Sequence, residues 1–191
     1  MSQSSAGPLR DGQANRIRNL LYFGLRYPWV RHGRNVHIKW STTMSSPHRD
    51  ITIGNDVYIG PRCYLQSDIE IGDKVLIAAN VALINADDHR YDVVGKTMWD
   101  SGRGDANRIV IEDDVWIGHG AVVLSGARVG RGSIVGAGSV VVGNIPSYSI
   151  VIPEKAKILR PRFTPEEIES HERLLAGSSR AARSVGSEDP M

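Results

Sequence analysis

The residues best suited to chemistry are a histidine and its acidic neighbours near the middle of the chain. His89 lies in the sequence DDHRYD, where Asp87, Asp88 and Asp92 surround it. An imidazole changes its charge near neutral pH, and a nearby carboxylate can orient the ring or stabilise its protonated form. These residues mark segment 87–108 as the place to look for chemistry, although a loop histidine can also be merely solvated.

A six-residue repeat on both sides of this segment predicts the elements that must position it. Aliphatic or small residues recur at every sixth position in two blocks, 51–86 and 109–146, and a second aliphatic residue usually follows two places later. A period of six fits neither an α-helix nor a long alternating strand. It predicts short strands joined by tight corners that often carry glycine, and therefore an all-β parallel β-helix.

The repeat also predicts which side chains enter the core. Cys63 occupies an inward position, which favours a small core residue over a nucleophile, and a single cysteine excludes an internal disulfide. Trp116 stands between inward Val115 and Ile117, so its side chain is expected to point outward. A large indole on the outside of a solenoid needs a partner, which could be a ligand or another subunit.

Three regions follow from these patterns. Residues 1–35 hold a polar N-terminus and a short capping helix, and residues 36–146 form the β-helix with 87–108 inserted as a loop. Residues 147–191 hold a strand, a helix and a disordered tail. Loops as long as 87–108 inside a compact fold are usually functional.

Helices are predicted on either side of the solenoid. The first runs from Ala14 to about Tyr27, and it is expected to cover the open end of the first coil. The second is opened by a capping box, in which Thr164 is the N-cap and Glu167 occupies the third helical position. The aliphatic residues near one face of the first helix are Ile17, Leu20, Leu21 and Leu25.

The composition argues against several classes of protein. The net charge is only +2, so no global field attracts nucleic acid. No apolar run approaches the roughly 20 residues that cross a bilayer, and no signal-peptide arrangement is found. These features favour a cytoplasmic protein with neither a membrane span nor a nucleic-acid partner.

The chain resembles the hexapeptide-repeat acyltransferases, and most closely the xenobiotic and polysaccharide O-acetyltransferases. The matching segments are INADDHRYD (84–92), VWIGHGAVVLSGARVGRGSIVGAGSVV (115–141) and AKILRPRF (156–163). The resemblance covers roughly residues 36–163 and implies a left-handed parallel β-helix. The hand comes from the resemblance alone, because ordinary crossover rules predict the opposite one.

The resemblance further implies that acetyl-CoA is the co-substrate. His89 matches the loop histidine that acts as general base, and Trp116 is expected to line the groove near it. No metal is expected. The residues implied to bind acetyl-CoA are Trp116, Gly118, His119, Ala137, Val142 and Arg160. Those implied to bind the acceptor or to orient His89 are Asn85, Asp87, Asp88 and Asp92.

The resemblance also implies a homotrimer with active sites between subunits, so that His89 of one chain faces Trp116 of its neighbour. The expected reaction is direct acetyl transfer to a hydroxyl of a sugar or polysaccharide precursor in cell-surface polysaccharide or lipopolysaccharide assembly. Loop 87–108 and the irregular segment 41–50 would surround this acceptor. The alternatives are N-acetylation of a nucleotide-linked amino sugar, acetylation of an antibiotic of the streptogramin type, and a non-catalytic scaffold.

A departure at two adjacent positions bears on these expectations. Related enzymes often place Thr-Lys after the last hexad, near the CoA phosphates, where this chain has Val142 and Gly143. The expected phosphate contacts therefore move to Lys157, Arg160 or Arg162, or are weak.

A γ-type carbonic anhydrase shares the β-helix but binds zinc through three histidines, two of them five residues apart. Five residues after His119 stands Leu124, which cannot bind a metal. This alternative is therefore disfavoured.

Overall fold

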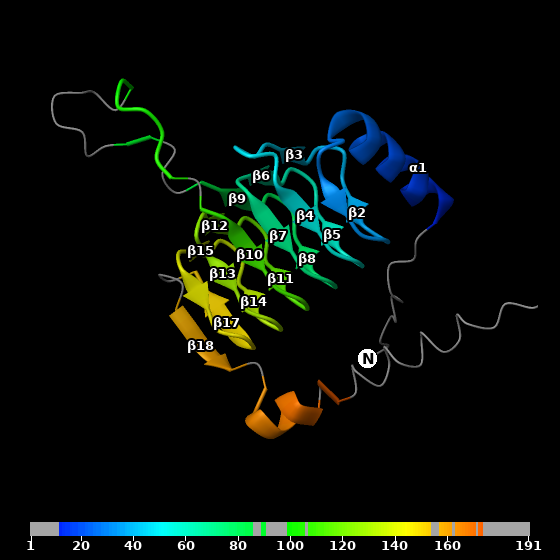
Figure 1. Ribbon diagram of the computed structural model, residues 1–191. Coiled ribbons are helices and arrows are strands. Elements are labelled where there is room, and N and C mark those ends of the chain that lie inside the picture. The colour runs from blue at the N-terminus through cyan, green and yellow to red at the C-terminus, as the bar shows by residue number, and fades with distance from the viewer. Residues whose placement is uncertain are drawn as a thin grey trace, which may run out of the picture.

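The computed structural model describes residues 12–85, 89–90, 99–105, 107–153, 157–161, 163–170 and 172–173. Figure 1 shows a solenoid of short stacked strands, with a helix at its first coil and a long loop that leaves it part-way along. Successive coils repeat the same three strand positions, so the predicted all-β parallel β-helix is confirmed.

The strands form three sheets, here called sheets A, B and C, and successive coils add a strand to each. Described strand pairs are parallel except for the last pair of sheet B, β17 with β18, which is antiparallel. Sheet A contains β1 (Arg31–His32), β4 (Ile51–Ile53), β7 (Ile69–Ile71), β10 (Ile109–Ile111), β13 (Arg128–Val129) and β16 (Asn144–Ile145). Sheet B contains β2 (His37–Ile38), β5 (Tyr58–Ile59), β8 (Leu76–Ile77), β11 (Trp116–Ile117), β14 (Ile134–Val135), β17 (Ser149–Ile152) and β18 (Lys157–Pro161). Sheet C contains β3 (Thr43–Met44), β6 (Tyr64–Gln66), β9 (Ala82–Ile84), β12 (Val122–Leu124) and β15 (Val140–Val141).

The solenoid is longer than the repeat alone indicates. Its first strand begins at Arg31, ahead of the predicted start at 36, and its last parallel strand ends at Ile152, beyond 146. The outer coils keep the strand pairing but lose the regular spacing of aliphatic residues, which is why the repeat does not reveal them.

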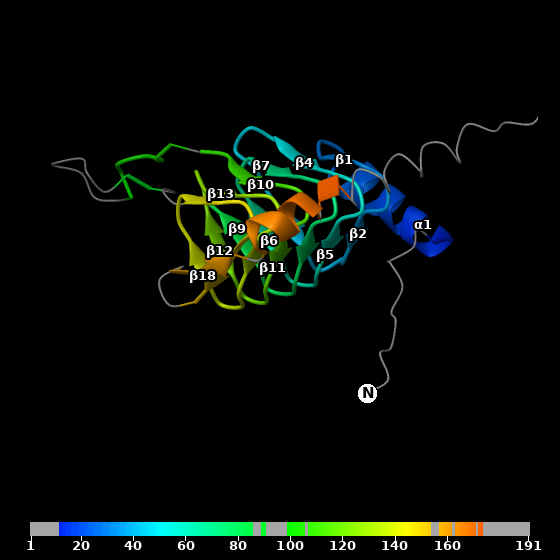
Figure 2. The ribbon, with the colours of Figure 1, turned by 90° about the horizontal axis from the view of Figure 1, so that it is seen from below.

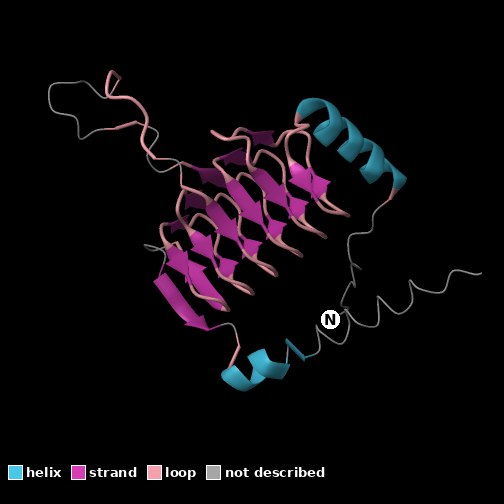
Figure 3. Ribbon diagram, viewed as in Figure 1, coloured by secondary structure: helices cyan, strands magenta, loops and turns pink. Residues whose placement is uncertain are grey.

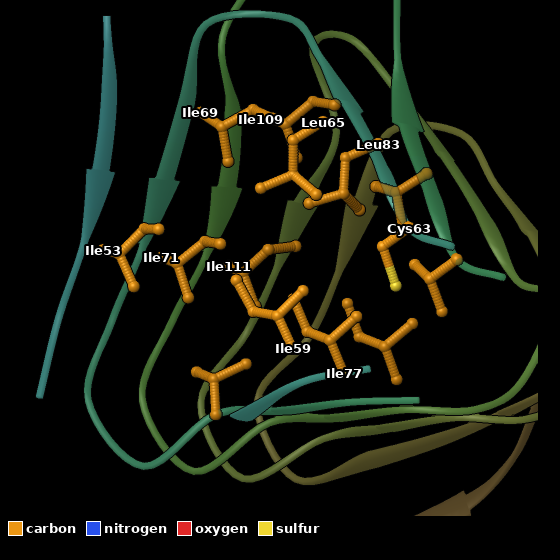
Figure 4. Packing of buried hydrophobic residues seen from close by; sticks show 14 of the residues in the cluster. Ile53, Ile59, Cys63, Leu65, Ile69, Ile71, Ile77, Leu83, Ile109 and Ile111 are labelled. Carbon is orange, nitrogen blue, oxygen red and sulfur yellow. The ribbon is translucent and has the colours of Figure 1, made fainter. Parts of the chain in front are cut away.

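The inward positions of the repeat form a continuous core along the solenoid axis (Figure 4). Isoleucine, leucine and valine side chains from the three sheets meet there and are almost completely buried. Cys63 is fully buried among them as predicted, and burial raises the pKa of its thiol. Ser133 and Ser139 replace aliphatic residues in the second block and are also fully buried.

Close stacking of the coils explains the corner glycines. A Cβ atom on Gly118 would lie 2.5 Å from the backbone nitrogen of Ala137 in the next coil, and one on Gly60 would lie 2.7 Å from the backbone of Ala78. These glycines are needed because neighbouring backbones approach them. Several corner positions with positive φ hold other residues instead, among them Asn80 with φ of 59°.

The N-terminal helix covers the first coil, but with a different face from the predicted one (Figure 3). It comprises α1 (Gln13–Leu21), continued by the π-helical turn η1 (Tyr22–Arg26). Its buried residues are Asn15, Tyr22 and Phe23. The aliphatic residues Ile17, Leu20, Leu21 and Leu25 are 43–77% exposed.

Hydrogen bonding explains this choice of face. The first coil has no preceding coil to satisfy its backbone carbonyls, and such groups need donors. Asn15 donates through Nδ2 to the backbone carbonyl oxygen of Val36 over 3.1 Å. The hydroxyl of Tyr22 donates to the backbone carbonyl oxygen of Thr42 over 2.5 Å. The helix therefore covers the coil end with polar and aromatic side chains.

The C-terminal helix begins as predicted. Thr164 donates its backbone N–H to Oε2 of Glu167 over 2.8 Å, and Glu167 returns its N–H to the Thr164 hydroxyl over 3.2 Å. Residues 165–170 and 172–173 are helical, and the Glu172 carboxylate pairs with Arg131 of the solenoid at 3.1 Å. Figure 2 shows this helix beside the solenoid. Across the described residues, no helix is long and apolar enough to span a membrane.

Candidate active site

The loop containing His89 leaves the solenoid at the corner where sheet C leads to sheet A, here called the C–A corner. This corner follows β9 and precedes β10, and Figure 2 shows the described part of the loop projecting away from the stacked coils. Asn85 lies half-buried where the loop departs, and His89 is exposed within it. The loop folds back on itself, because Arg90 donates its backbone N–H to the carbonyl of Gly102 over 3.0 Å. Asp87, Asp88 and Asp92 lie outside the described residues.

Trp116 lies on a different side of the solenoid. It belongs to β11 of sheet B and, as predicted, its side chain points outward, 51% exposed. Leu76 and Ile134 are its register partners in the adjacent coils, so the indole lies in an outward-facing apolar row. Such a row offers a surface for another subunit or for the apolar part of a ligand.

The corner between sheets B and C brings together three more of the predicted acetyl-CoA residues. Gly118 donates its backbone N–H to the Val135 carbonyl over 2.7 Å, and His119 accepts through its backbone carbonyl from Gly138 over 2.8 Å. Ala137 is exposed on the coil above Gly118. Small residues on this B–C corner leave room for an extended chain to lie against the backbone.

Asn80 of the preceding coil fixes the ring of His119. The amide Nδ2 of Asn80 lies 3.1 Å from Nε2 of His119. An amide nitrogen can only donate, so Nε2 accepts and the ring proton resides on Nδ1. His119 therefore presents its other ring nitrogen, Nδ1, as a donor directed away from Asn80.

The remaining two predicted contacts lie elsewhere. Val142 is 69% exposed at the C–A corner of the fifth coil, just after β15. Arg160 belongs to β18, where its backbone pairs with Ile150 of β17, and its side chain lies outside the description. The residues predicted to bind acetyl-CoA therefore lie together on sheet B and at the B–C corner, except for Val142 and Arg160, which lie elsewhere.

Within one chain, the loop of His89 and the side chain of Trp116 leave the solenoid on different sides. Each coil passes through sheets A, B and C in turn, so the C–A corner lies opposite sheet B in the cross-section of the solenoid. The loop leaves from that corner, whereas Trp116 points away from the outer face of sheet B.

The outer faces of the three sheets differ in chemistry. Sheet A is ionic, because Arg31 pairs with Asp50 at 2.8 Å and Arg128 pairs with Glu112. Sheets B and C instead expose large apolar side chains. The most exposed of these are Leu76 at 46% and Trp116 at 51% on sheet B, and Tyr64 at 50% and Val140 at 48% on sheet C. Two adjacent apolar faces form a surface suited to covering by other subunits.

The two blocks of the repeat match a known sequence family. Residues 50–85 and 108–143 match the family described as bacterial transferase hexapeptide (six repeats). The chain is a hexapeptide-repeat protein. The match stops where the loop begins and starts again after it. In the structure, the next strand of the solenoid, β10, likewise follows the loop and pairs with β7.

Relatives of this hexapeptide-repeat protein include named acetyltransferases. A probable acetyltransferase of Mycobacterium tuberculosis is 36% identical over 132 residues, which cover 68% of this chain and 43% of the relative. A putative acetyltransferase of Saccharomyces cerevisiae is 33% identical over 115 residues, 56% of this chain and 57% of the relative. The chain spans between 23% and 57% of the length of the curated relatives that it matches.

Solved structures show the same architecture. The hexapeptide-repeat acetyltransferase of Vibrio cholerae superimposes with a TM-score of 0.66 at 27% identity, covering 82% of this chain and 85% of that one. The Vibrio cholerae protein has also been solved in complex with acetyl coenzyme A. That structure matches this chain with a TM-score of 0.54 and 25% identity, and the match covers 82% of this chain and 81% of that chain.

The structure adds one group that the sequence reading did not identify. His48 and Asp68 meet at the C–A corner, where Nδ1 of His48 lies 2.5 Å from Oδ2 of Asp68. Ser46 donates its hydroxyl to the other carboxylate oxygen over 2.5 Å. The two residues lie one coil apart, His48 after β3 and Asp68 after β6 of sheet C. In the described part of the chain, no three His, Cys, Asp or Glu residues form a group that could hold a metal ion.

Proposed function

We propose that this protein is an acetyl-CoA-dependent O-acetyltransferase that modifies a hydroxyl of a sugar or polysaccharide precursor in the cytoplasm. The hexapeptide repeat and the acetyltransferase relatives support the reaction class. The complex of the Vibrio cholerae acetyltransferase with acetyl coenzyme A supports the donor. We place the product in cell-surface polysaccharide assembly, the biosynthetic role implied by the resemblance.

The observation that carries this proposal is the separation of His89 from Trp116 within one chain. The loop with His89 projects from the C–A corner, while Trp116 and the residues near it line sheet B and the B–C corner. The apolar outer faces of sheets B and C provide the surface through which copies associate. In the proposed homotrimer, the loop of one chain reaches the Trp116 row of its neighbour and completes three equivalent sites.

We place the donor at the B–C corner. Gly118 and Ala137 carry no bulky side chain, so the pantetheine arm of acetyl-CoA can lie against the backbone beside Trp116. The Nδ1–H of His119 supplies a donor along this path, because Asn80 holds its Nε2. Lys157, Arg160 and Arg162, on or next to β18, are the cations assigned to the CoA phosphates, since Val142 and Gly143 offer no charge.

His89 is the proposed general base. Its neutral ring removes the proton from the acceptor hydroxyl as that oxygen attacks the carbonyl carbon of the thioester. The C–S bond then breaks and the sulfur leaves as a thiolate, which takes up a proton to give free CoA. Transfer is direct, without an acyl-enzyme, and a positioned base of this kind contributes ~10²–10⁴-fold to the rate.

Calorimetric titration with acetyl-CoA tests the donor, with light scattering on the same sample for the assembly. We expect micromolar binding at one site per chain of a trimer. Release of free CoA thiol is then followed with maltose, a lipopolysaccharide-type hexose and a nucleotide-linked amino sugar as acceptors. Faster reaction with the amino sugar would replace O-acetylation by N-acetylation. Absence of donor binding would overturn the proposal in favour of a scaffold.

A further inference from the structure

The pair formed by His48 and Asp68 joins the first two coils at the C–A corner. Asp68 is 6% exposed, whereas the side chain of His48 is 69% exposed. The carboxylate accepts from Nδ1 of His48, from the Ser46 hydroxyl and from the backbone N–H of His48 at 3.3 Å. A nearly buried carboxylate with three donors is thus used to hold one exposed imidazole.

These hydrogen bonds keep Asp68 ionised. Burial by itself would raise the pKa of this carboxyl, but the hydrogen bonds from Ser46 and His48 outweigh it and lower the pKa below its ordinary value. An ionised carboxylate only accepts hydrogen bonds, so Nδ1 of His48 must donate. In the neutral ring, Nε2 is then left as an acceptor on the exposed side, in a fixed orientation.

The pair lies directly at the root of the loop that carries His89. Ile109, the first residue of β10 after the loop, donates its N–H to the Asp68 carbonyl over 2.9 Å. The Ser67 hydroxyl donates to the carbonyl of Asn107 over 3.3 Å. Arg108 pairs with Asp50, whose own N–H donates to Ser46 Oγ over 2.8 Å. The orientation of His48 is therefore tied to the place where the loop rejoins the solenoid.

The arrangement is not that of an acyl-enzyme triad. The Ser46 hydroxyl donates to Asp68, and its oxygen accepts from the N–H of Asp50, so its proton is not directed to His48. A nucleophilic serine would instead donate to the imidazole. What the group offers to a ligand is the acceptor nitrogen Nε2 of His48.

We propose that His48, held by Asp68, binds the acceptor substrate by accepting a hydrogen bond from one of its hydroxyls at Nε2. This inference rests on the proposed function and adds a residue that selects acceptors carrying a second hydroxyl besides the one that reacts. His89 in the adjacent loop acts on the reacting hydroxyl, and His48 at the loop root positions the sugar. Asp68 is a positioning residue, because it acts through the ring of His48.

Asp68→Asn tests this assignment while leaving His48 in place. The Asn carbonyl oxygen can still accept from Ser46, but its amide donates to Nδ1, so the ring proton moves to Nε2 and the acceptor nitrogen is lost. ¹⁵N-NMR of the histidine rings should show a proton on Nδ1 of His48 in the wild type and on Nε2 in the variant. His48→Ala removes the ring, and His32→Ala removes an exposed histidine of the first coil as the matched control.

Kinetics with maltose as the probe acceptor supply the second readout. We expect both Asp68→Asn and His48→Ala to raise the KM for maltose about tenfold, with kcat within about threefold and acetyl-CoA affinity unchanged. His32→Ala should change neither constant. An unchanged KM in both variants, with wild-type turnover intact, would overturn this inference alone. No acetyl transfer by the wild type to maltose or any other sugar acceptor would overturn the proposed function, and the inference with it.

Discussion

The side-chain amide of Asn80 donates to Nε2 of His119 across 3.1 Å, and so joins the third coil to the fourth at the B–C corner. The bond fixes the tautomer of an otherwise exposed ring, because the amide nitrogen can only donate. In the proposed trimer this ring lies on the path of the donor.

Removing this hydrogen bond should weaken donor binding. In Asn80→Ala the His119 ring is no longer held, and we expect the Kd for acetyl-CoA to rise by about three- to tenfold, since one hydrogen bond contributes about 1 kcal/mol. Calorimetric titration measures the change. Asn55→Ala is the matched control, because Asn55 makes an equivalent coil-to-coil bond to Asp73 at a different corner. Equal effects of the two substitutions would contradict a donor role for His119.

His89→Ala tests the base. Turnover should fall by ~10²-fold or more while the trimer and the Kd for acetyl-CoA stay unchanged, because the exposed ring makes no contribution to the core. Initial-rate kinetics and calorimetry on one preparation give both quantities. Asp105→Asn alters another exposed polar residue of the same loop and should leave turnover intact. A turnover of His89→Ala within a few-fold of wild type would remove His89 from the mechanism.

Gly118→Ala tests the close stacking of the coils. The added methyl group would lie 2.5 Å from the Ala137 backbone nitrogen, so the coils must separate locally. We expect a loss of about 1–3 kcal/mol in the free energy of unfolding, measured by urea denaturation at fixed protein concentration. Gly24→Ala is the control, because the nearest atom to its new methyl group lies at an ordinary 3.8 Å. Equal stability of the two variants would mean that the coils are not packed this tightly.

Association should depend on the apolar faces and not on the ionic one. Leu76→Asp introduces a charge beside Trp116 on sheet B, and we expect the trimer to dissociate to monomers in light scattering. Val110→Asp makes the same kind of change on sheet A and should leave the trimer intact. A trimer that survives Leu76→Asp but not Val110→Asp would place the interface on sheet A.

The stability contributed by Asp68 should depend on pH. Because hydrogen bonds hold the folded-state pKa below the ordinary carboxyl value near ~3.9, the contribution is complete above that value. It is lost as the pH falls through the lower, folded-state pKa. The difference in unfolding free energy between wild type and Asp68→Asn should therefore be largest at neutral pH and shrink as the pH falls below the ordinary carboxyl pKa. A difference that grows on acidification would contradict the lowered pKa.

The regular coils could be predicted from the sequence because their spacing reports directly on the core. Every sixth residue returns to the same inward position, so Cys63 and Trp116 could be assigned to the inside and the outside from position alone. The capping box at Thr164 and Glu167 was equally readable, because both partners lie within one helical turn.

Two features could not be predicted in this way. Asn15 and Tyr22 are buried because they donate hydrogen bonds to backbone carbonyls of the first coil. The helical pattern of the N-terminal helix instead predicted that its aliphatic face would be buried. His48 and Asp68 are 20 residues apart and meet only because one coil lies upon the next at a corner. His48 lies outside the repeat and Asp68 lies at one of its corners, so the repeat alone could not pair them.

The coils before and after the loop stack on each other as if no loop intervened. Ile69 of β7 lies in register with Ile109 of β10, and Ile71 with Ile111. The stacking of the coils therefore does not depend on the length of the segment inserted between β9 and β10. Under the proposed function, an evolving or engineered protein can exchange this segment, and with it one wall of the acceptor site, while the stacked core is inherited unchanged.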